Sequence, residues 1–188
     1  MTLVTSAAIF SAQAHDGMLR RGTRTAYIVH PMEAAAIAAS LTQDEEIIAA
    51  ALLHDVIEDC GVSRGELAAR FGERVAALVE AETQTPGEEW LTRKRETVEK
   101  LERGGQEACI LALADKLSNM RAIRRDFVRE GEAVFDKFHE RDRGLHAWYY
   151  RTCARLVGRE LSHTDAWREL DALVLEVFGE ADTEEKDG

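Results

Sequence analysis

Residues 50–59 constrain the fold of this chain more than any other stretch. Their sequence, AALLHDVIED, predicts a single helix with an apolar side and four ionisable residues near its end. His54 and Glu58 are four residues apart, and so are Asp55 and Asp59. Residues at this spacing share a helix face, with Cβ atoms about 5–6 Å apart. The stretch therefore predicts a compact patch of one imidazole and three carboxylates.

Such a patch needs a neutralising partner, because adjacent carboxylates repel one another unless protons or a cation intervene. Imidazole and carboxylate together suit a divalent ion such as Mn, Fe or Zn. A solvated helix end is the alternative, although the apolar run up to His54 favours partial burial. Adjacent helical residues diverge by about 100°, so His54 and Asp55 can share one ion only if it sits astride the helix. Other helices must then complete the ligand shell.

Two further segments offer candidate ligands. His30 stands directly before a proline at the start of a predicted helix, although a lone histidine there is more often structural. Asp115 interrupts an apolar helical run, and a buried carboxylate is costly unless a metal or a basic group partners it. A surface position beside Lys116 is the alternative. Asn119 lies one turn further on and shares the face of Asp115.

Together these residues predict one metal shell of two imidazoles and two carboxylates from three helices: His30, His54, Asp55 and Asp115. His30 and Asp115 are thus the ligands from other helices that a metal ion bound by His54 and Asp55 requires. The shell also leaves room for water on a six-coordinate ion. Glu58 and Asp59 would then be free beside that water.

The whole chain predicts an all-α fold, a bundle of about eight to ten helices. Prolines occur only at 31 and 86, and no convincing β alternation is present. Asp44 predicts the N-cap of the helix that holds His54, and Ser63 with Glu66 predicts a capping box. Predicted helices span about residues 2–15, 31–41, 44–59, 63–71, 73–83, 90–102, 107–125, 132–158 and 162–178. Residues 1–179 are expected to form a single domain, and the acidic residues 180–188 a disordered tail.

Composition indicates the setting. A chain of 188 residues with 45% apolar residues can bury a full core without disulfides. The three cysteines, Cys60, Cys109 and Cys153, are odd in number and widely spaced, which favours a reducing, cytoplasmic compartment. The start of the chain lacks the basic residues and the continuous apolar run of a secretory signal. No apolar stretch approaches 18 residues, so no membrane span is expected.

The net charge and the clustering of basic residues indicate which kinds of molecule the protein can bind. A net charge of −11 disfavours general nucleic-acid binding, because phosphate repulsion would have to be overcome. The basic residues are clustered, and the loop at residues 20–24 combines arginines with a glycine, a composition suited to phosphate contact. A basic pocket on an acidic protein favours a small phosphorylated metabolite over a polymer. A homo-oligomer is compatible with the sequence.

Four stretches carry a resemblance to a known family. They are HDG at 15–17 with Arg20 and Arg21, YIVHP at 27–31, ALLHDVIED at 51–59 and LADKLSNMR at 113–121. Their order resembles that of the HD-domain metal phosphohydrolases. More narrowly, it resembles the hydrolase domain of RelA/SpoT enzymes and the stand-alone small alarmone hydrolases. The match covers roughly residues 7–155.

The resemblance implies an all-α fold and a manganese-type site, with Fe, Zn or Ni as other divalent ions. It implies that the ligands are His30, His54, Asp55 and Asp115. It also implies that Glu58 and Asp59 orient and activate the attacking water. The implied substrate contacts are Arg20, Arg21, Lys94, Asn119 and Arg143. The implied reaction removes pyrophosphate from the 3′ position of guanosine tetra- or pentaphosphate, (p)ppGpp.

Departures from the family pattern leave other substrates open. Cys60, Ser118 and Ala122 replace residues common in the family and are expected to affect substrate choice. The alternatives are hydrolysis of another nucleotide (a 5′-nucleotide, an adenine alarmone or a phosphorylated dinucleotide) and a non-catalytic alarmone-binding partner protein. Among the other histidines, His15 is expected to pack under the loop. His139, His146 and His163 are expected at the surface or at helix ends. The aromatic run at 148–150 is expected to be mostly core, with one ring lining the nucleotide pocket as the alternative.

Overall fold

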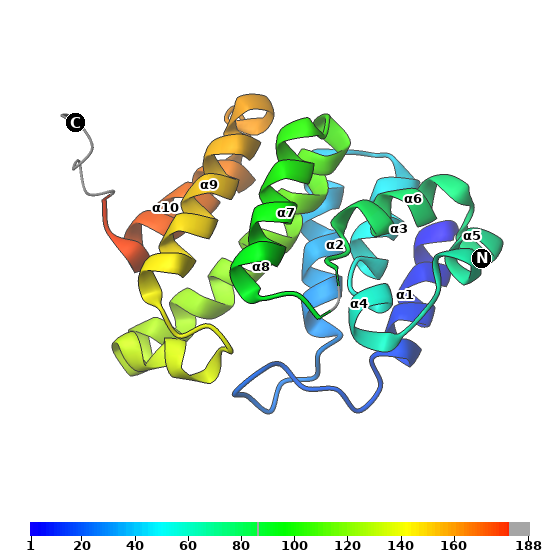
Figure 1. The fold of residues 1–188 in the computed structure, drawn as a ribbon. Coiled ribbons are helices and arrows are strands. Elements are labelled where there is room, and N and C mark those ends of the chain that lie inside the picture. Colours follow the sequence, from blue (N-terminus) through cyan, green and yellow to red (C-terminus); the bar gives the residue numbers. More distant parts are fainter. Residues whose placement is uncertain (86, 181–188) are drawn as a thin grey trace.

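Helices make up the regular structure of the described residues, 1–85 and 87–180, in this computed structural model (Figure 1). The elements are α1 (Leu3–Ala14), α2 (Val29–Leu41), α3 (Glu45–Leu53), α4 (Val56–Cys60), α5 (Arg64–Phe71), α6 (Glu73–Glu82), α7 (Trp90–Arg103), α8 (Gln106–Glu130), η1 (Gly131–Lys137), α9 (Arg143–Leu161) and α10 (Asp165–Phe178). The all-α prediction is confirmed, whereas the predicted tail lies outside the described residues apart from its first residue. Within the described ranges, no helix has the length and apolar character that a membrane span requires.

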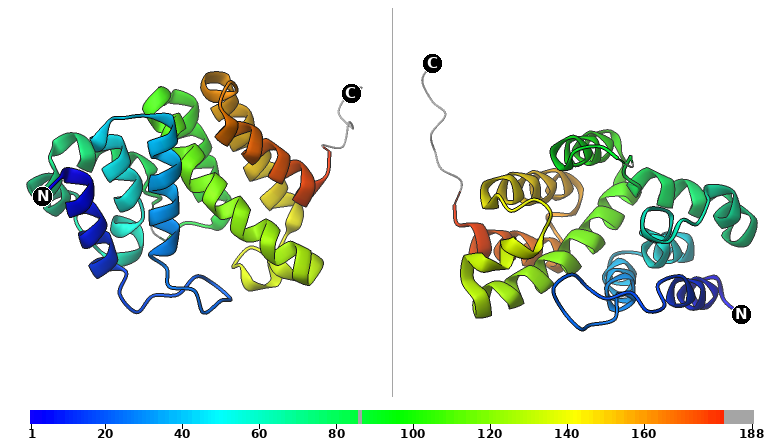
Figure 2. Two further views of the ribbon diagram at one scale, coloured as in Figure 1. Left: turned by 180° about the vertical axis from the view of Figure 1, so that it is seen from behind. Right: turned by 60° about the horizontal axis from the view of Figure 1, so that its bottom comes forward.

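The long helix α8 forms the centre of the fold. Helices α2 and α3 pack on one side of it, and α9 and α10 pack on the other (Figures 1 and 2). Its residues between Cys109 and Ile123 are nearly all buried, because apolar side chains occupy most positions of that run. A helix that is apolar around most of its circumference must be covered on several sides. This placement brings Asp115, in the middle of α8, to the junction of the two groups of helices.

The predicted N-caps at Asp44 and Ser63 are confirmed, whereas Glu66 does not complete the predicted capping box, because its carboxylate faces Arg70 at 3.1 Å. The side chain of Asp44 accepts a hydrogen bond from the backbone N–H of Glu46 at 2.9 Å, at the N-terminus of α3. The hydroxyl of Ser63 accepts one from the N–H of Glu66 at 3.1 Å and begins α5. Each cap satisfies a backbone donor that the first helical turn leaves without a partner.

The prediction of one continuous helix over residues 50–59 is wrong. Helix α3 ends at Leu53 and α4 begins at Val56, with His54 and Asp55 in the turn between them. Hydrogen bonds hold both turn residues: His54 Nδ1 lies 2.9 Å from the carbonyl oxygen of Ala51, and Tyr27 Oη donates to Asp55 Oδ2 at 2.7 Å. The break lets two adjacent side chains face one point, which a regular helix would prevent.

The predicted helix over 132–158 is also wrong, because it splits into η1 and α9. Helix α8 continues to Glu130 and ends at Gly131, whose φ of 61° favours glycine. Asp142 then caps α9, since its side chain accepts from the N–H groups of Gly144 at 2.7 Å and Leu145 at 3.1 Å. A strong N-cap starts a new helix at Asp142, within a stretch whose apolar periodicity alone predicts one continuous helix.

Truncation of a core residue on α8 tests this arrangement. Leu117 is fully buried, so Leu117→Ala is expected to lower the free energy of unfolding by about 2–5 kcal/mol through lost burial and a residual cavity. Val128 on the same helix is 64% exposed, and Val128→Ala should change stability by about 0.5 kcal/mol or less. Chemical denaturation of both variants measures the difference. Equal stabilities would contradict the central position of α8.

Candidate active site

The four predicted ligands converge on one point. The imidazoles of His30 and His54 face each other with their Nε2 atoms 3.1 Å apart. Asp55 Oδ2 lies 3.5 Å from His30 Nε2 and 3.1 Å from His54 Nε2. Asp115 Oδ1 lies 3.3 Å and 3.7 Å from the same two nitrogen atoms. Helices α2 and α8 and the turn between α3 and α4 therefore present their ligand atoms to a common centre.

This donor set fits a divalent metal ion. His54 Nδ1 lies 2.9 Å from the carbonyl oxygen of Ala51, which can only accept, so in the neutral ring it is Nε2 that carries the lone pair. Ligands about 2.1 Å from one ion stand about 3 Å apart when they are neighbours in a six-coordinate shell. The spacings between donor atoms in this cluster, 3.1–3.7 Å, are close to that value. The donor atoms of His30, His54 and Asp115 all lie within 4.8 Å of one another. Asp55 falls outside that group of three, and its place in the cluster rests on its contacts with both imidazole nitrogens.

The electrostatics of the cluster also favour a cation. Burial acts to lower the pKa of His54, but the carboxylates of Asp55 and Asp115 raise that pKa well above its ordinary value. Burial lowers the pKa of His30. Burial opposes ionisation of Asp55, yet the neighbouring His54 holds its pKa below the usual range. The carboxylates thus attract positive charge to the space between the imidazoles.

Asp115 is a half-buried, well-partnered carboxylate, and the alternative of a surface Asp115–Lys116 step is wrong. Lys116 is only 6% exposed, and its ammonium group donates to Asp115 Oδ2. Asn119 Nδ2 donates to Asp115 Oδ1 at 2.5 Å. Arg20 Nη2 in turn donates to Asn119 Oδ1 at 2.8 Å. The amide of Asn119 therefore connects the cluster to the loop between α1 and α2.

Tyr27 supports the other carboxylate. Its hydroxyl donates to Asp55, its ring stacks on His15 with centroids 4.9 Å apart, and the Arg20 guanidinium lies 5.6 Å from its centroid. His15 is buried beneath the loop, as expected from the sequence. Burial raises the pKa of Tyr27, and the charges of Asp55 and Asp59 raise it further. Tyr27 therefore stays a hydrogen-bond donor to Asp55.

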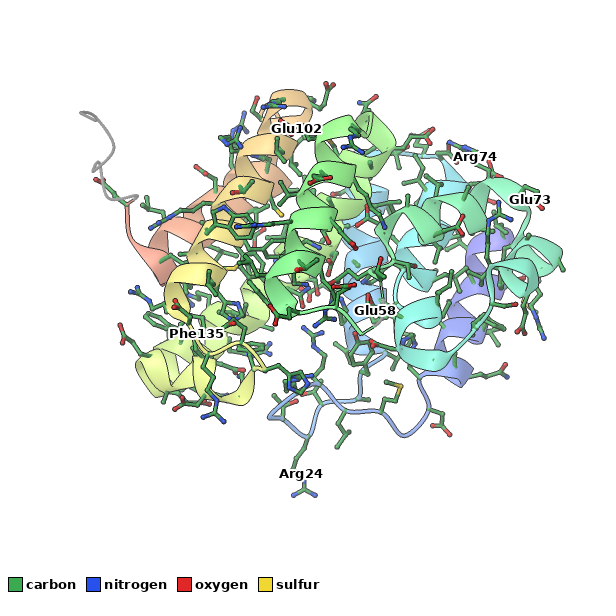
Figure 3. All side chains as sticks on the ribbon, viewed as in Figure 1. Arg24, Glu58, Glu73, Arg74, Glu102 and Phe135 are labelled. Carbon is green, nitrogen blue, oxygen red and sulfur yellow. The ribbon has the colours of Figure 1, made fainter. Side chains whose placement is uncertain are left out.

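The predicted acid pair stands beside the cluster. Glu58 and Asp59 both line the cavity in front of the ligands, and Figure 3 shows Glu58 at the centre of the molecule, between α4 and α7. Burial raises the pKa of both carboxyls, and the charge of Asp55 raises both further. Arg93 Nη1 lies 3.7 Å from Glu58 Oε1. Both carboxyls therefore hold a proton more readily than free side chains do.

The cavity has a volume of about 430 Å³, within the range that holds a small ligand. Lys94 enters it from α7, and its Nζ lies 3.2 Å from Gln84 Oε1 and 4.9 Å from the ring centroid of Tyr149. Burial lowers the pKa of Lys94 to about 8, with a contribution from the charge of Lys116. Lys94 is therefore a cation at neutral pH that can readily lose its proton.

The loop that carries the predicted basic residues docks across the cavity. Arg20 N–H donates to the carbonyl of Thr25 at 2.8 Å, which narrows the loop. Gly22 has a φ of 68° and lies so close to Lys137 that a Cβ there would come within 2.7 Å of its Cδ. The close approach fixes the loop against η1. Figure 3 shows that Arg24, at the tip, extends away from the protein.

The predicted substrate contacts separate into two groups. Four line the cavity, namely Arg20, Arg21, Lys94 and Asn119. Arg143 does not: its Nη2 donates to the carbonyl of Val177 at 2.8 Å and its Nη1 lies 3.6 Å from Glu132. Of the departures from the family pattern, Ala122 lines the cavity, whereas Cys60 and Ser118 do not.

Several cavity residues were not foreseen. A surface position for His146 is wrong, because its ring is buried against Trp90, Phe135 and Phe138, although it lies in the first turn of α9. In the aromatic run, the alternative of a ring that lines the cavity describes two residues, Tyr149 and Tyr150. The spacing of the residues at 146, 149 and 150, which share one face of α9, was the available signal.

Comparison with known protein families matches residues 7–143 to the HD domain. A relative from Vibrio cholerae, named guanosine-3′,5′-bis(diphosphate) 3′-pyrophosphohydrolase, is 30% identical over 88% of this chain and 25% of its own length. One of the same name from Aquifex aeolicus is 38% identical over 61% of this chain and 17% of its own length. The chain thus spans a quarter or less of these bacterial relatives. A relative of that name from Xenopus tropicalis is 35% identical over 65% of this chain and 70% of its own length.

Solved structures share the fold. A metazoan orthologue of SpoT, described as hydrolysing ppGpp, superposes with a TM-score of 0.78 at 22% identity, covering 94% of this chain and 96% of that one. A Listeria monocytogenes protein gives a TM-score of 0.73 at 30% identity, covering 80% of this chain and 99% of its own. The family match spans most of the chain and includes all four residues that are predicted to bind the metal. The chain therefore belongs to the HD domain family.

Proposed function

We propose that the protein is a metal-dependent 3′-pyrophosphohydrolase of guanosine tetra- and pentaphosphate, with manganese as its ion. One observation carries the proposal: two imidazoles and two carboxylates meet at one point, with an acid pair and a cation-lined cavity beside them. The names of the bacterial and vertebrate relatives support the choice of substrate. The three free cysteines accord with a reducing, cytoplasmic setting.

The proposed ligands of the ion are His30, His54, Asp55 and Asp115. A bound divalent ion supplies Lewis acidity, which lowers the pKa of a water toward neutrality. The donor set of nitrogen and oxygen atoms also accepts iron, zinc or nickel. Tyr27 and Lys116 each hold one of the two carboxylates by a hydrogen bond and so orient it toward the imidazoles.

The proposed reaction is hydrolysis at the 3′ pyrophosphate. The oxygen of a water forms a bond to the phosphorus attached to the 3′ oxygen, and the bond between that phosphorus and the 3′ oxygen breaks. Glu58 or Asp59 accepts the proton that the water loses, and the 3′ oxygen takes up a proton as it leaves. The products are pyrophosphate and GDP or GTP.

The cations of the cavity bind and orient the substrate. Lys94 and the arginines at 20 and 21 line the same space as the acid pair, so they can hold phosphates close to it. Their charge offsets the repulsion between an anionic substrate and the cluster of carboxylates. Asn119, held between Arg20 and Asp115, lies where it can contact the nucleoside.

The low pKa of Lys94 predicts an alkaline limit to activity. The groups facing Lys94 are Asp115 and Lys116 from α8, Glu58 from α4, Tyr149 and His146 from α9, and Arg93 from its own helix. Lys94 is cationic below about pH 8 and loses its charge above that value. We therefore expect kcat/KM, which reports the free enzyme, to fall by about tenfold per pH unit above about pH 8.

Profiles of kcat/KM from pH 6 to 10 measure this limit. Lys94→Arg keeps a charge throughout the range and should move the decline to higher pH. Lys94→Met should give low kcat/KM with no decline near pH 8. An unchanged profile in both variants would assign the alkaline limit to another group.

Product analysis of a nucleotide panel tests the proposed function. The manganese-loaded protein is incubated with ppGpp, its pentaphosphate analogue, an adenine alarmone, 5′-nucleotides and a phosphorylated dinucleotide. Release of pyrophosphate and GDP from ppGpp, well above turnover of the others, is the expected result. Turnover of another member assigns a different nucleotide substrate. A protein that retains no metal after manganese loading and turns over no member of the panel would instead be a non-catalytic binding protein.

A further inference from the structure

The outward nitrogen of His30 enters a buried hydrogen-bond chain. His30 Nδ1 lies 2.8 Å from Ser118 Oγ, and these residues are 3% and 1% exposed. Ser118 Oγ also lies 2.8 Å from Glu33 Oε2. Glu33 follows His30 by three residues on α2, and Ser118 follows Asp115 by three on α8, two helices that pack side by side (Figure 2). These two hydrogen bonds thus join α2 to α8 on the side of His30 that faces away from the other three proposed ligands.

The direction of each hydrogen bond in the chain follows from its chemistry. A carboxylate can only accept, so the Ser118 hydroxyl donates its one hydrogen to Glu33. The hydroxyl can then meet His30 only as an acceptor. Nδ1 of His30 must therefore carry a proton, and the lone pair of the ring falls on Nε2, which faces His54 and the two carboxylates.

Glu33 is itself held in place from outside. Arg121 Nη1 donates to Glu33 Oε1 at 3.0 Å. The other side of the same guanidinium donates to both carboxylate oxygens of Glu169 on α10, at 2.7 and 2.6 Å. Arg121 thus keeps one oxygen of Glu33 occupied and leaves the other directed at Ser118.

We propose that Glu33 and Ser118 are positioning residues of the metal site, which fix His30 in the tautomer that presents Nε2 to the ion. The inference rests on the proposed metal site and adds residues that touch neither ion nor substrate. Ser118 was expected from the sequence to affect substrate choice. It lies behind His30 and away from the cavity, so its effect is on metal binding.

Titration calorimetry with Mn²⁺ tests the proposal. Removing a partner that orients a metal-bound histidine typically weakens affinity by about 10–100-fold, and this loss is expected for Ser118→Ala and for Glu33→Ala. The double variant should bind no more weakly than the weaker single variant, because both residues act through one hydrogen bond. Glu169→Ala leaves the chain from Glu33 to His30 intact and should bind Mn²⁺ as the wild type does.

A second measurement separates positioning from general damage. At saturating Mn²⁺ the kcat of Ser118→Ala should approach that of the wild type, whereas the Mn²⁺ concentration at half activity rises by the same factor as the dissociation constant. Ser118→Cys preserves volume but offers only a weak acceptor, so it should weaken binding even if the alanine variants unfold.

These measurements separate failure of the proposed metal site from failure of the proposed positioning role. Wild-type protein that binds no Mn²⁺ would reject the proposed metal site. Wild-type binding with unchanged Mn²⁺ affinity in folded Ser118→Ala, Ser118→Cys and Glu33→Ala would reject the positioning role alone.

Discussion

Asp55→Asn is expected to lose bound metal and activity together. The substitution removes a charged ligand whose Oδ2 lies within 3.5 Å of both imidazoles, while it keeps the volume of the side chain. A metal ion contributes several kcal/mol to stabilisation of charge in the transition state, so turnover should fall by roughly 10³-fold or more. Elemental analysis of the purified protein and pyrophosphate release from ppGpp measure the two losses.

Asp136→Asn is the matched control. Asp136 is exposed on η1 and lies outside the cavity lining, so this variant should retain both metal and turnover. His54→Ala should lose both bound metal and turnover, as expected for Asp55→Asn. Full turnover by Asp55→Asn without bound metal would show that the cluster has no catalytic role.

Glu58→Gln is expected to separate chemistry from metal binding. Glu58 lines the cavity but, unlike Asp55 and Asp115, its carboxylate makes no close contact with either imidazole in the described residues, so the variant should keep its ion. Loss of a positioned general base typically lowers kcat by about 10²–10⁴-fold, and a decrease in that range is expected. The measurement is kcat at saturating Mn²⁺ and substrate, with metal content determined on the same sample.

Glu102→Gln provides the comparison. Glu102 lies near the end of α7, far from Glu58 in Figure 3, and its partner is Arg159 at 3.6 Å. This exchange should leave kcat unchanged. Normal turnover by Glu58→Gln would contradict its role as the base and assign that role to Asp59. Loss of the ion from Glu58→Gln would show that Glu58 is itself a metal ligand.

The convergence of His54, Asp55 and Asp115 was predictable from the sequence because each is chemically conspicuous where it stands, whereas His30 was included only to complete the proposed shell. A carboxylate in the apolar run of α8 needs a partner, and a histidine beside an aspartate at the end of an apolar helix needs neutralisation. The turn at His54 and Asp55 was not predictable, because Tyr27, from a segment far along the chain, stabilises it. Local periodicity carries no information about such a bond.

The substrate contacts illustrate the same limit. Lys94 and Arg20 reach the cavity, but whether a long basic side chain faces a ligand or a neighbouring carbonyl depends on packing. Arg143 bonds to the C-terminal end of α10 through the carbonyl of Val177. The helix break before α9 moves Arg143 to the first residue of a new helix, and a reading that continues one helix through this region misplaces it.

Anomalous X-ray diffraction from crystals of the manganese-loaded protein tests the central claim most directly. The account predicts one strong manganese peak bonded to His30 Nε2, His54 Nε2, Asp55 and Asp115, at about 2.0–2.3 Å from each ligand atom. A manganese peak elsewhere, or none between these four side chains in protein that turns over ppGpp, would contradict it.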